Sequence, residues 1–364
     1  MRNFNWSLVA ACISVTVLGV VSIASATLHD PAASGEYKKQ ALYGVLGITC
    51  MIVFSLVDYR NWKRWAVGVF ALNFLLLAFI LVRGHSALGA QRWISLGPFG
   101  TFQPSEPAKL ALAMVIAALL CRGEYKRLRE LWLPLLAVGV PALLILRQPD
   151  LGTTLVVLAI LVAQLYFGLP RLAHFAIFIA GVATLAAFAV GTKYVLKPFQ
   201  KARLLVFLNP KADPQGAGWN LNQSKIAVGS GEWLGKGLHH GTQTQLNFVP
   251  EHSRDFIFTV IGEELGFLGA VLLIGLYGLI IFGGIRTMLS AQDRFGFLLA
   301  VGIVAMLGFH IVVNIGMTVG VMPITGIPLP FMSYGGSSII TNYCAIGVLL
   351  NIYLQRDRVV LGNA

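Results

Sequence analysis

The stretch FGFLLAVGIVAMLGFHIVVNIGMTVGV, residues 295–321, decides the class of fold. It contains no Asp, Glu, Lys or Arg. A helix needs about 20 predominantly apolar residues to cross a bilayer, and a soluble core helix is rarely apolar over such a length. The stretch therefore predicts a membrane-spanning helix.

The composition of the whole chain agrees with this prediction. Of its 364 residues, 57% are hydrophobic and 12% are charged, and the mean hydropathy is +0.76. A soluble domain carries about 25% charged residues, so a soluble enzyme is excluded, as are disordered, collagen-like and disulfide-stapled chains. Four cysteines lie in or at the ends of apolar segments without paired spacing, and they are predicted to be small core residues. They are Cys12, Cys50, Cys121 and Cys344.

Working outward from 295–321, similar uncharged stretches predict an all-α polytopic membrane protein with ten spans. The predicted spans are 7–28, 41–57, 65–82, 102–121, 131–146, 151–169, 172–191, 256–285, 295–321 and 335–354. The first is preceded by Arg2 and ends in Ala24-Ser25-Ala26, as a signal peptide does, but it is longer than the usual apolar region of about 7–15 residues. We expect an uncleaved helix and a single membrane domain over 1–364.

The distribution of basic residues predicts the orientation. Ten spans place both termini on one side, and 13 of the 27 Lys and Arg lie there. Of the 14 on the other side, eight lie in the long loop 192–254, and long loops largely escape the positive-inside rule. The remaining comparison of 13 against 6 places both termini in the cytoplasm and 192–254, with its short helices, outside the cell membrane.

Two patterns in this loop have a structural interpretation. Lys193, Lys197 and Lys201 recur every four residues among apolar ones, which predicts a short helix on an anionic membrane surface, although Pro198 argues against a straight one. The string GSGEWLG at 229–235 nearly matches a dinucleotide fingerprint, but its third Gly comes one place late and no strand precedes it. A turn-rich loop is the better prediction.

Candidates for chemistry follow by elimination among the 15 carboxylates. Most lie in turns or loops, where a solvated charge is a sufficient explanation. Six fall at or inside the outer ends of predicted helices, where an ionisable group is costly and marks function. They are Glu106, Asp150, Glu251, Asp255, Glu263 and Glu264.

The fourth predicted helix must include polar residues to reach spanning length. Its apolar part is short, so Glu106 and Lys109 are drawn to the depth of the outer leaflet, three residues apart on one helix face. Such charges usually face a cavity, and a snorkelling interfacial pair is the alternative. The turn at 147–150, which ends in Asp150, is drawn inward for the same reason.

The segment 322–338, MPITGIPLPFMSYGGSS, is too apolar for water and too rich in Pro and Gly for a helix. Irregular backbone at membrane depth is tolerated only where protein or a cavity surrounds it. The segment predicts a partly re-entrant loop that lines a pocket. Asp255 opens the eighth predicted helix, 256–285, and either an N-cap or a catalytic acid fits its position. Glu263 and Glu264 lie deeper, where we expect structural polar contacts.

Several strings resemble the SEDS family (shape, elongation, division and sporulation) of cell-wall polymerases. They are GAQRWISLG at 89–97, QPSEPAKLALA at 103–113, QPDLGTTLV at 148–156, the stretch 216–266 with its DFIF string, and PLPFMSYGGSS at 328–338. Within the family, HGTQTQLNFVPE at 240–251 and the short C-terminus resemble the elongation-type branch more than the division-type branch.

The resemblance implies a glycosyltransferase that polymerises lipid II, the undecaprenyl-pyrophosphate-linked disaccharide, on the outer face of the bacterial cytoplasmic membrane. It also implies a class B penicillin-binding protein that crosslinks the strands, and other elongation-complex membrane proteins, as partners. The acid of the DFIF string is regarded as essential in the family, which carries over to Asp255. The family often has Thr before this acid, and here Arg254 stands there and should lower its pKa.

This chemistry assigns roles to residues. A carboxylate can take the proton of the acceptor hydroxyl, which makes Asp255 the candidate base, and cations can take up the charge of the leaving pyrophosphate. A divalent cation, Mg²⁺ or Mn²⁺, could assist, whereas an organic cofactor or nucleic acid is not expected. The predicted substrate-binding residues are Arg92, Glu106, Lys109, Asp150, Arg203, Gln245 and Ser333.

Three alternatives remain open. A flippase for the lipid-linked precursor, or another secondary transporter, would also need buried charges and a lipid-facing groove. A division-type polymerase would share nearly all the same strings. A purely structural scaffold is disfavoured by the charges at several outer helix ends.

Overall fold

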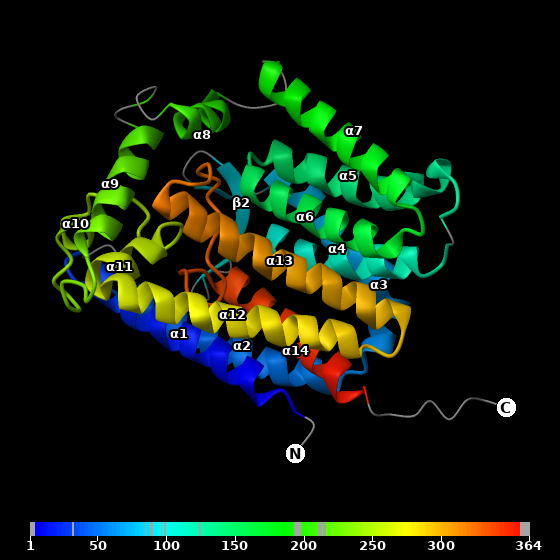
Figure 1. Cartoon of the computed structure of the whole chain (residues 1–364), viewed down its shortest axis with the longest axis horizontal. Helices are drawn as coiled ribbons and strands as arrows, with labels where there is room; N and C mark the ends of the chain where they lie inside the picture. Colours follow the sequence, from blue (N-terminus) through cyan, green and yellow to red (C-terminus); the bar gives the residue numbers. More distant parts are fainter. Residues whose placement is uncertain are drawn as a thin grey trace.

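The computed structural model describes residues 4–30, 33–83, 85–87, 90–95, 97, 100–123, 125–192, 198–209, 213 and 216–356. They form a helical bundle with one small sheet (Figure 1). The helices are α1 (Trp6–Ala26), α2 (Glu36–Leu56), α3 (Tyr59–Arg83), α4 (Ser105–Leu120), α5 (Trp132–Arg147), α6 (Leu151–Gly168), α7 (Leu172–Gly191), α8 (Pro198–Leu208), α9 (Ala217–Ser230), α10 (Thr242–Gln245), α11 (Ile257–Glu264), α12 (Gly266–Ser290), α13 (Arg294–Val319) and α14 (Gly336–Leu354), with a 3-10 turn at Leu128–Leu131.

The all-α polytopic class is confirmed. Among the described residues, eight helices are long and apolar enough to span a membrane: α1, α2, α3, α5 with its preceding turn, α6, α12, α13 and α14. Helix α4 has 16 residues, and within the described side chains of α7 an apolar run covers Leu172–Leu185. The count of ten spans stays a prediction. Helix α4 is buried along almost its whole length against α3, α5, α6 and α13, so neighbouring helices rather than lipid surround it.

One predicted span is wrong, because it is not a single continuous helix. The stretch 256–285 contains two helices, α11 and α12, which break at Leu265 because Gly266 takes the left-handed conformation, with φ +63°. The turn at 231–235 fills the break, since the amides of Phe267 and Leu268 donate hydrogen bonds to its carbonyls. The near-fingerprint at 229–235 thus belongs to the end of α9 and a turn packed on the start of α12.

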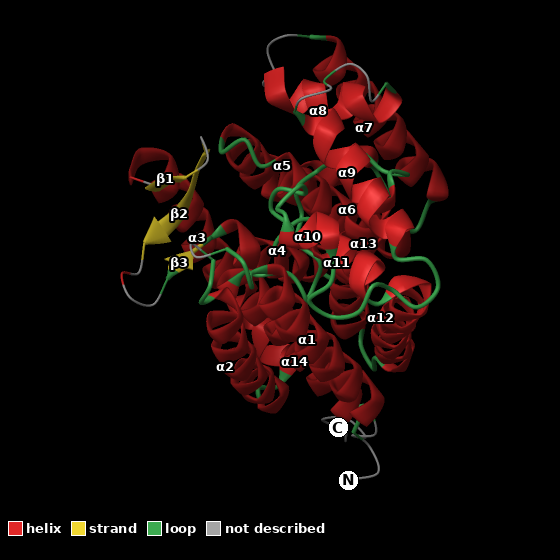
Figure 2. Ribbon diagram, turned by 90° about the vertical axis from the view of Figure 1, so that its left-hand side faces the viewer, coloured by secondary structure: helices red, strands yellow, loops and turns green. Residues whose placement is uncertain are grey.

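The loop between α3 and α4 forms an antiparallel sheet that the sequence analysis did not predict. Its strands are β1 (His85–Ala87), β2 (Ala90–Ser95) and β3 (Thr101–Phe102), in the order β1-β2-β3. Figure 2 shows the sheet at the side of the bundle, with α10 and α11 in front of the spanning helices.

Helices α9 to α11 lie at one end of the bundle, whereas α1 begins and α14 ends at the other (Figure 1). The Ser25 hydroxyl, at the end of α1, accepts a hydrogen bond from the amide of His239 in this region. This arrangement fits the predicted placement of 192–254 opposite the termini. Of the predicted surface helix, Lys193 and Lys197 lie outside the described residues, and Lys201 belongs to α8, which begins at Pro198.

The segment between α13 and α14 is irregular and buried, as predicted. It descends into the bundle: the Tyr277 hydroxyl in α12 donates to Pro330 O at 2.7 Å, and a Cβ on Gly19 in α1 would lie 2.8 Å from Met332 Cα. The amide of Gln40 in α2 donates to Ser333 O at 2.9 Å. Side chains of two helices thus bond backbone carbonyls of the segment inside the bundle, as irregular backbone at this depth requires. We call 321–335 the re-entrant segment.

Candidate active site

Asp255 lies in the turn that precedes α11, outside the eight spans. It does not cap the helix, because the N-cap residue is Phe256 and no side chain bonds the first turn. This finding overturns the N-cap interpretation. A methyl group placed on Gly326, in the re-entrant segment, would lie 3.1 Å from Asp255 Oδ2 and 3.2 Å from Arg203 Nη1. The carboxylate and the guanidinium therefore flank the same small space over a glycine.

The environment of Asp255 makes it a better base than an ordinary aspartate. Burial raises its pKa to about 6, against the opposing effect of the Arg203 charge, while Glu251 raises it and Arg254 lowers it further. Burial also lowers the pKa of Arg203, which Asp255 partly offsets. The expectation that Arg254 lowers the pKa of Asp255 has the right sign, but burial outweighs it, and Arg203 lowers this pKa more than Arg254 does.

Arg254 has other partners. Its guanidinium pairs with Glu36 at 3.4 Å and with Glu251 at 3.2 Å, and it lies 5.7 Å from the ring centroid of Tyr334. The carboxylates of Glu36 and of Glu251, which lies in the same turn, therefore partly balance its charge, and Arg254 lowers the pKa of Asp255 less than Arg203 does.

Asp150 and Arg92 form a second charged pair of the site. Asp150 caps α6, accepting from Thr153 N at 3.1 Å, and its Oδ2 lies 3.9 Å from Arg92 Nη1. Arg92, from β2, also donates to the backbone carbonyls of Gln148 and Pro149. The Asp150 charge acts on both Asp255 and Arg203. Four of the predicted site residues thus form one electrostatically linked group.

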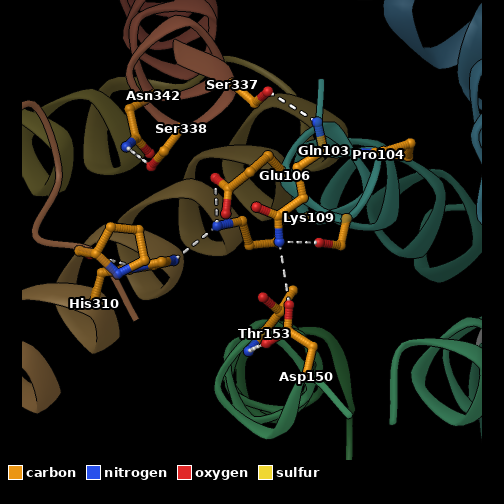
Figure 3. Close-up of polar contacts among 12 residues, drawn as sticks. Gln103, Pro104, Glu106, Lys109, Asp150, Thr153, His310, Ser337, Ser338 and Asn342 are labelled. Carbon is orange, nitrogen blue, oxygen red and sulfur yellow. Dashed lines mark hydrogen bonds and ion pairs between the residues drawn. The ribbon is translucent and has the colours of Figure 1, made fainter. Parts of the chain in front are cut away.

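Glu106 and Lys109 form the predicted pair on one face of α4, at 2.9 Å (Figure 3). Lys109 is fully buried and also lies 3.0 Å from His310 Nε2 in α13. Arg92 contacts the 148–150 turn rather than this pair. The contacts of Arg92 and those of the Glu106–Lys109 pair are therefore separate, and the part of these residues in substrate binding stays a prediction.

Two further predicted binding residues have structural partners. The Ser333 hydroxyl donates to Arg254 O at 2.6 Å and accepts from Leu329 N at 2.8 Å. The Gln245 amide donates to Ser25 O at 2.9 Å and its oxygen lies 2.6 Å from His29 Nδ1. Both side chains hold the outer end of the fold together, and their contact with substrate stays a prediction.

His310, Asn314 and Gly326 contact residues of the site and were not among the predicted ones. The signal for the first two was present: they are polar residues four apart in an uncharged span, and so lie on one face of the helix. Gly326 gave no signal among 39 glycines, because its importance comes only from what surrounds it.

Comparison with known proteins shows the family to which the chain belongs. The family model of FtsW, RodA and SpoVE, described as cell cycle protein, matches residues 5–358. The chain belongs to this SEDS family. The probable peptidoglycan glycosyltransferase FtsW of Trichlorobacter lovleyi is 37% identical over 97% of this chain and 93% of its own length. The peptidoglycan glycosyltransferase RodA of Treponema pallidum is 34% identical over 97% and 98%.

A solved structure on the structural coordination of polymerization and crosslinking by a peptidoglycan synthase complex contains a similar chain. It has a TM-score of 0.84 and 32% identity, and the match covers 98% of this chain and 99% of that one. This SEDS protein is therefore an integral membrane enzyme, a peptidoglycan glycosyltransferase.

A divalent cation would find few ligands in this SEDS protein. Across the part of the chain that the structure describes, no three His, Cys, Asp or Glu side chains gather into a metal site built from protein ligands alone. The strongest charge near Asp255 is the cationic Arg203. The described residues thus offer Mg²⁺ or Mn²⁺ no site made of protein ligands alone, and we derive no step through either ion.

Proposed function

We propose that this SEDS protein polymerises lipid II into glycan strands on the outer face of the bacterial cytoplasmic membrane during cell elongation. The observation that carries the proposal is the acid with a raised pKa, Asp255, which shares a small space over Gly326 with the guanidinium of Arg203. A base and a cation side by side suit a reaction that removes a proton and expels an anion.

In this mechanism the acceptor 4-hydroxyl attacks the anomeric carbon of the donor sugar. The new bond joins the acceptor oxygen to that carbon, and the bond from the carbon to the pyrophosphate oxygen breaks. Asp255 takes the hydroxyl proton, and Arg203, supported by Arg92, stabilises the charge that develops on the leaving undecaprenyl pyrophosphate.

The elongation-type assignment rests on the string at 240–251, because relatives carry both FtsW and RodA names. The division-type polymerase is the alternative. A class B penicillin-binding protein is the proposed partner, which fits the similarity to a chain of a peptidoglycan synthase complex.

The direct test is incubation of the purified protein with lipid II, with and without a class B penicillin-binding protein, followed by separation of the products. We expect glycan strands. Transport of lipid II across vesicle membranes without any strand formation would instead favour the flippase alternative.

The pKa of Asp255 predicts how the polymerisation rate depends on pH. A base must be unprotonated, so a raised pKa of about 6 means that the rate should be constant above pH 7 and fall below pH 6. Arg203→Gln removes a charge that lowers this pKa, so the midpoint should move to higher pH. The measurement is the rate normalised to its plateau between pH 4.5 and 8.5.

Arg254→Gln is the matched control, because Arg254 lowers the same pKa less than Arg203 does. Its midpoint should move less. A rate that stays flat down to pH 4.5 would contradict the assignment of Asp255 as the titrating base.

The orientation in the membrane is tested by thiol labelling. Asn222→Cys, on the exposed side of α9, should react with an impermeant reagent added to spheroplasts, and Gln292→Cys, between α12 and α13, should react only after the membrane is opened. Both variants are made after the native cysteines are replaced by alanine. Labelling of Gln292→Cys alone in sealed spheroplasts would reverse the proposed orientation.

A further inference from the structure

Two of the buried polar side chains of helix α13, His310 and Asn314, lie one turn apart. His310 Nδ1 lies 3.0 Å from Pro328 O, and Asn314 Nδ2 donates to Ile327 O at 2.7 Å. The two side chains thus hold the carbonyls of adjacent residues in the re-entrant segment. A helix inside a membrane protein seldom carries such groups without a purpose, because an unsatisfied polar group there is costly.

Asn314 makes a second bond, which connects the re-entrant segment to the catalytic turn. The same Nδ2 donates to Asp255 O at 2.8 Å, so one amide group holds Ile327 and Asp255 together. Ile327 directly follows Gly326 in the chain, and the carboxylate of Asp255 lies beside Gly326 in space. Asn314 is fully buried, and within the described residues its Oδ1 has no hydrogen-bond partner. The contacts of the Asn314 side chain with both segments are therefore the two hydrogen bonds that its Nδ2 donates.

The carbonyl groups next to that of Asp255 are held in the same way. Ser333 Oγ donates to Arg254 O at 2.6 Å, and Tyr334 N donates to Ser253 O at 2.9 Å. Three successive carbonyls of the catalytic turn are thus bonded to α13 or to the re-entrant segment. Among these donors, Asn314 is the one that bonds the residue carrying the proposed base.

His310 connects this arrangement to the buried ion pair. Its Nε2 faces the ammonium group of Lys109 at 3.0 Å, so Nε2 accepts and Nδ1 carries the proton that Pro328 O accepts. The Glu106–Lys109 pair therefore fixes the tautomer of the histidine that lies one turn below Asn314 on the same face of α13.

We propose that Asn314 is a positioning residue for the reaction: by donating to Ile327 O and Asp255 O together, it sets the place of the Asp255 carboxylate beside Gly326 and Arg203. This inference rests on the proposed function of Asp255 as the base. It assigns to α13, which carries no acid in its sequence, the task of aligning the acid of another segment.

Asn314→Asp tests the proposal, because it keeps the shape and replaces the donor by an acceptor that faces two carbonyls. Asn314→Ala removes the group altogether. We expect both to lower kcat by about 10–100-fold, as a displacement of about 1 Å at a reacting group can, and to leave KM for lipid II within about twofold. Hydrogen exchange of the amides in 253–257 and 325–329 should become faster in both variants.

Asn351→Ala is the matched control. Asn351 is also buried and also holds two backbone groups, Ser55 O and Tyr59 N, each at 2.8 Å, but at the other end of the bundle. Its loss should lower thermal stability and speed exchange near 55–59, while kcat per folded molecule stays at the wild-type value.

The outcomes separate the inference from the proposed function. If the wild type makes no strands from lipid II, the proposed function fails, and exchange alone then decides whether Asn314 holds the two segments. If the wild type is active and Asn314→Asp shows wild-type kcat, or shows wild-type exchange in 253–257, the positioning role is overturned. The positioning role is also overturned if the Asn314 variants lose activity only in proportion to their loss of folded protein, which is the behaviour expected of Asn351→Ala.

Discussion

Asp255→Asn should lower the rate of glycan-strand formation by about 10²–10⁴-fold, the usual contribution of a general base. The amide has the shape of the carboxylate but accepts no proton at neutral pH. The fold should be unaffected, because the side chain caps no helix and its backbone carbonyl still accepts from Asn314. The measurement is polymerisation of lipid II by equal amounts of folded wild type and variant.

Glu251→Gln is the control for this prediction. Glu251 is a neighbouring acid with a half-exposed side chain, and its charge raises the pKa of Asp255. The variant should therefore keep its rate at pH 7.5 and move the midpoint of the pH profile to lower pH. If Asp255→Asn polymerises at an ordinary rate, Asp255 is not the base, which must then be sought at Glu251 or Asp150.

Lys109→Met should lower the free energy of unfolding by about 3–5 kcal/mol, the usual cost of leaving one charge of a buried pair without its partner. Both side chains are almost completely buried, and Glu106 Oε2 receives its hydrogen bond from Lys109. The double change Glu106→Gln with Lys109→Met should recover most of the loss, since it leaves no buried charge. Thermal unfolding in detergent, compared across the three proteins, provides the measurement.

Lys236→Met is the matched control, because Lys236 also pairs with a buried glutamate, Glu263, at 2.8 Å. Here the lysine is partly exposed, and Glu263 keeps bonds from Gln243 N and from Thr244. The loss should stay below about 1 kcal/mol. Equal losses for the two lysines would contradict the importance of burial.

The double variant Glu106→Gln with Lys109→Met also tests substrate binding. If it binds lipid II normally, Lys109 does not contact the substrate.

The sequence predicted the spanning helices well because their signal is local. Each helix satisfies its own backbone, so composition over about 20 residues is enough. The Glu106–Lys109 pair and the re-entrant segment were predictable for the same reason. The break between α11 and α12 was not, since it depends on the bonds that Phe267 and Leu268 make to a turn more than thirty residues earlier.

The sequence was enough to predict which charged residues belong to the candidate site, but not how they are arranged in space. Charged residues at outer helix ends indicated Asp150 and Asp255, and the family resemblance added Arg92 and Arg203. Asp255 and Arg203 meet at Gly326, and the charges of Asp150 and Arg92 act on this pair, although the four residues come from separate parts of the chain. The raised pKa of Asp255 likewise comes from burial that a sequence does not reveal, whereas its neighbour Arg254 suggested the opposite.

The re-entrant segment also has a consequence for how the protein is made. Its backbone is satisfied by Gln40 of α2, Tyr277 of α12 and the polar face of α13, and it packs on Gly19 of α1. All these helices leave the ribosome before the segment does, and α14 follows it directly. The space beside Asp255 is therefore completed only when the end of the chain enters the membrane, so we expect an unfinished or truncated chain to be inactive toward lipid-linked sugars during biogenesis.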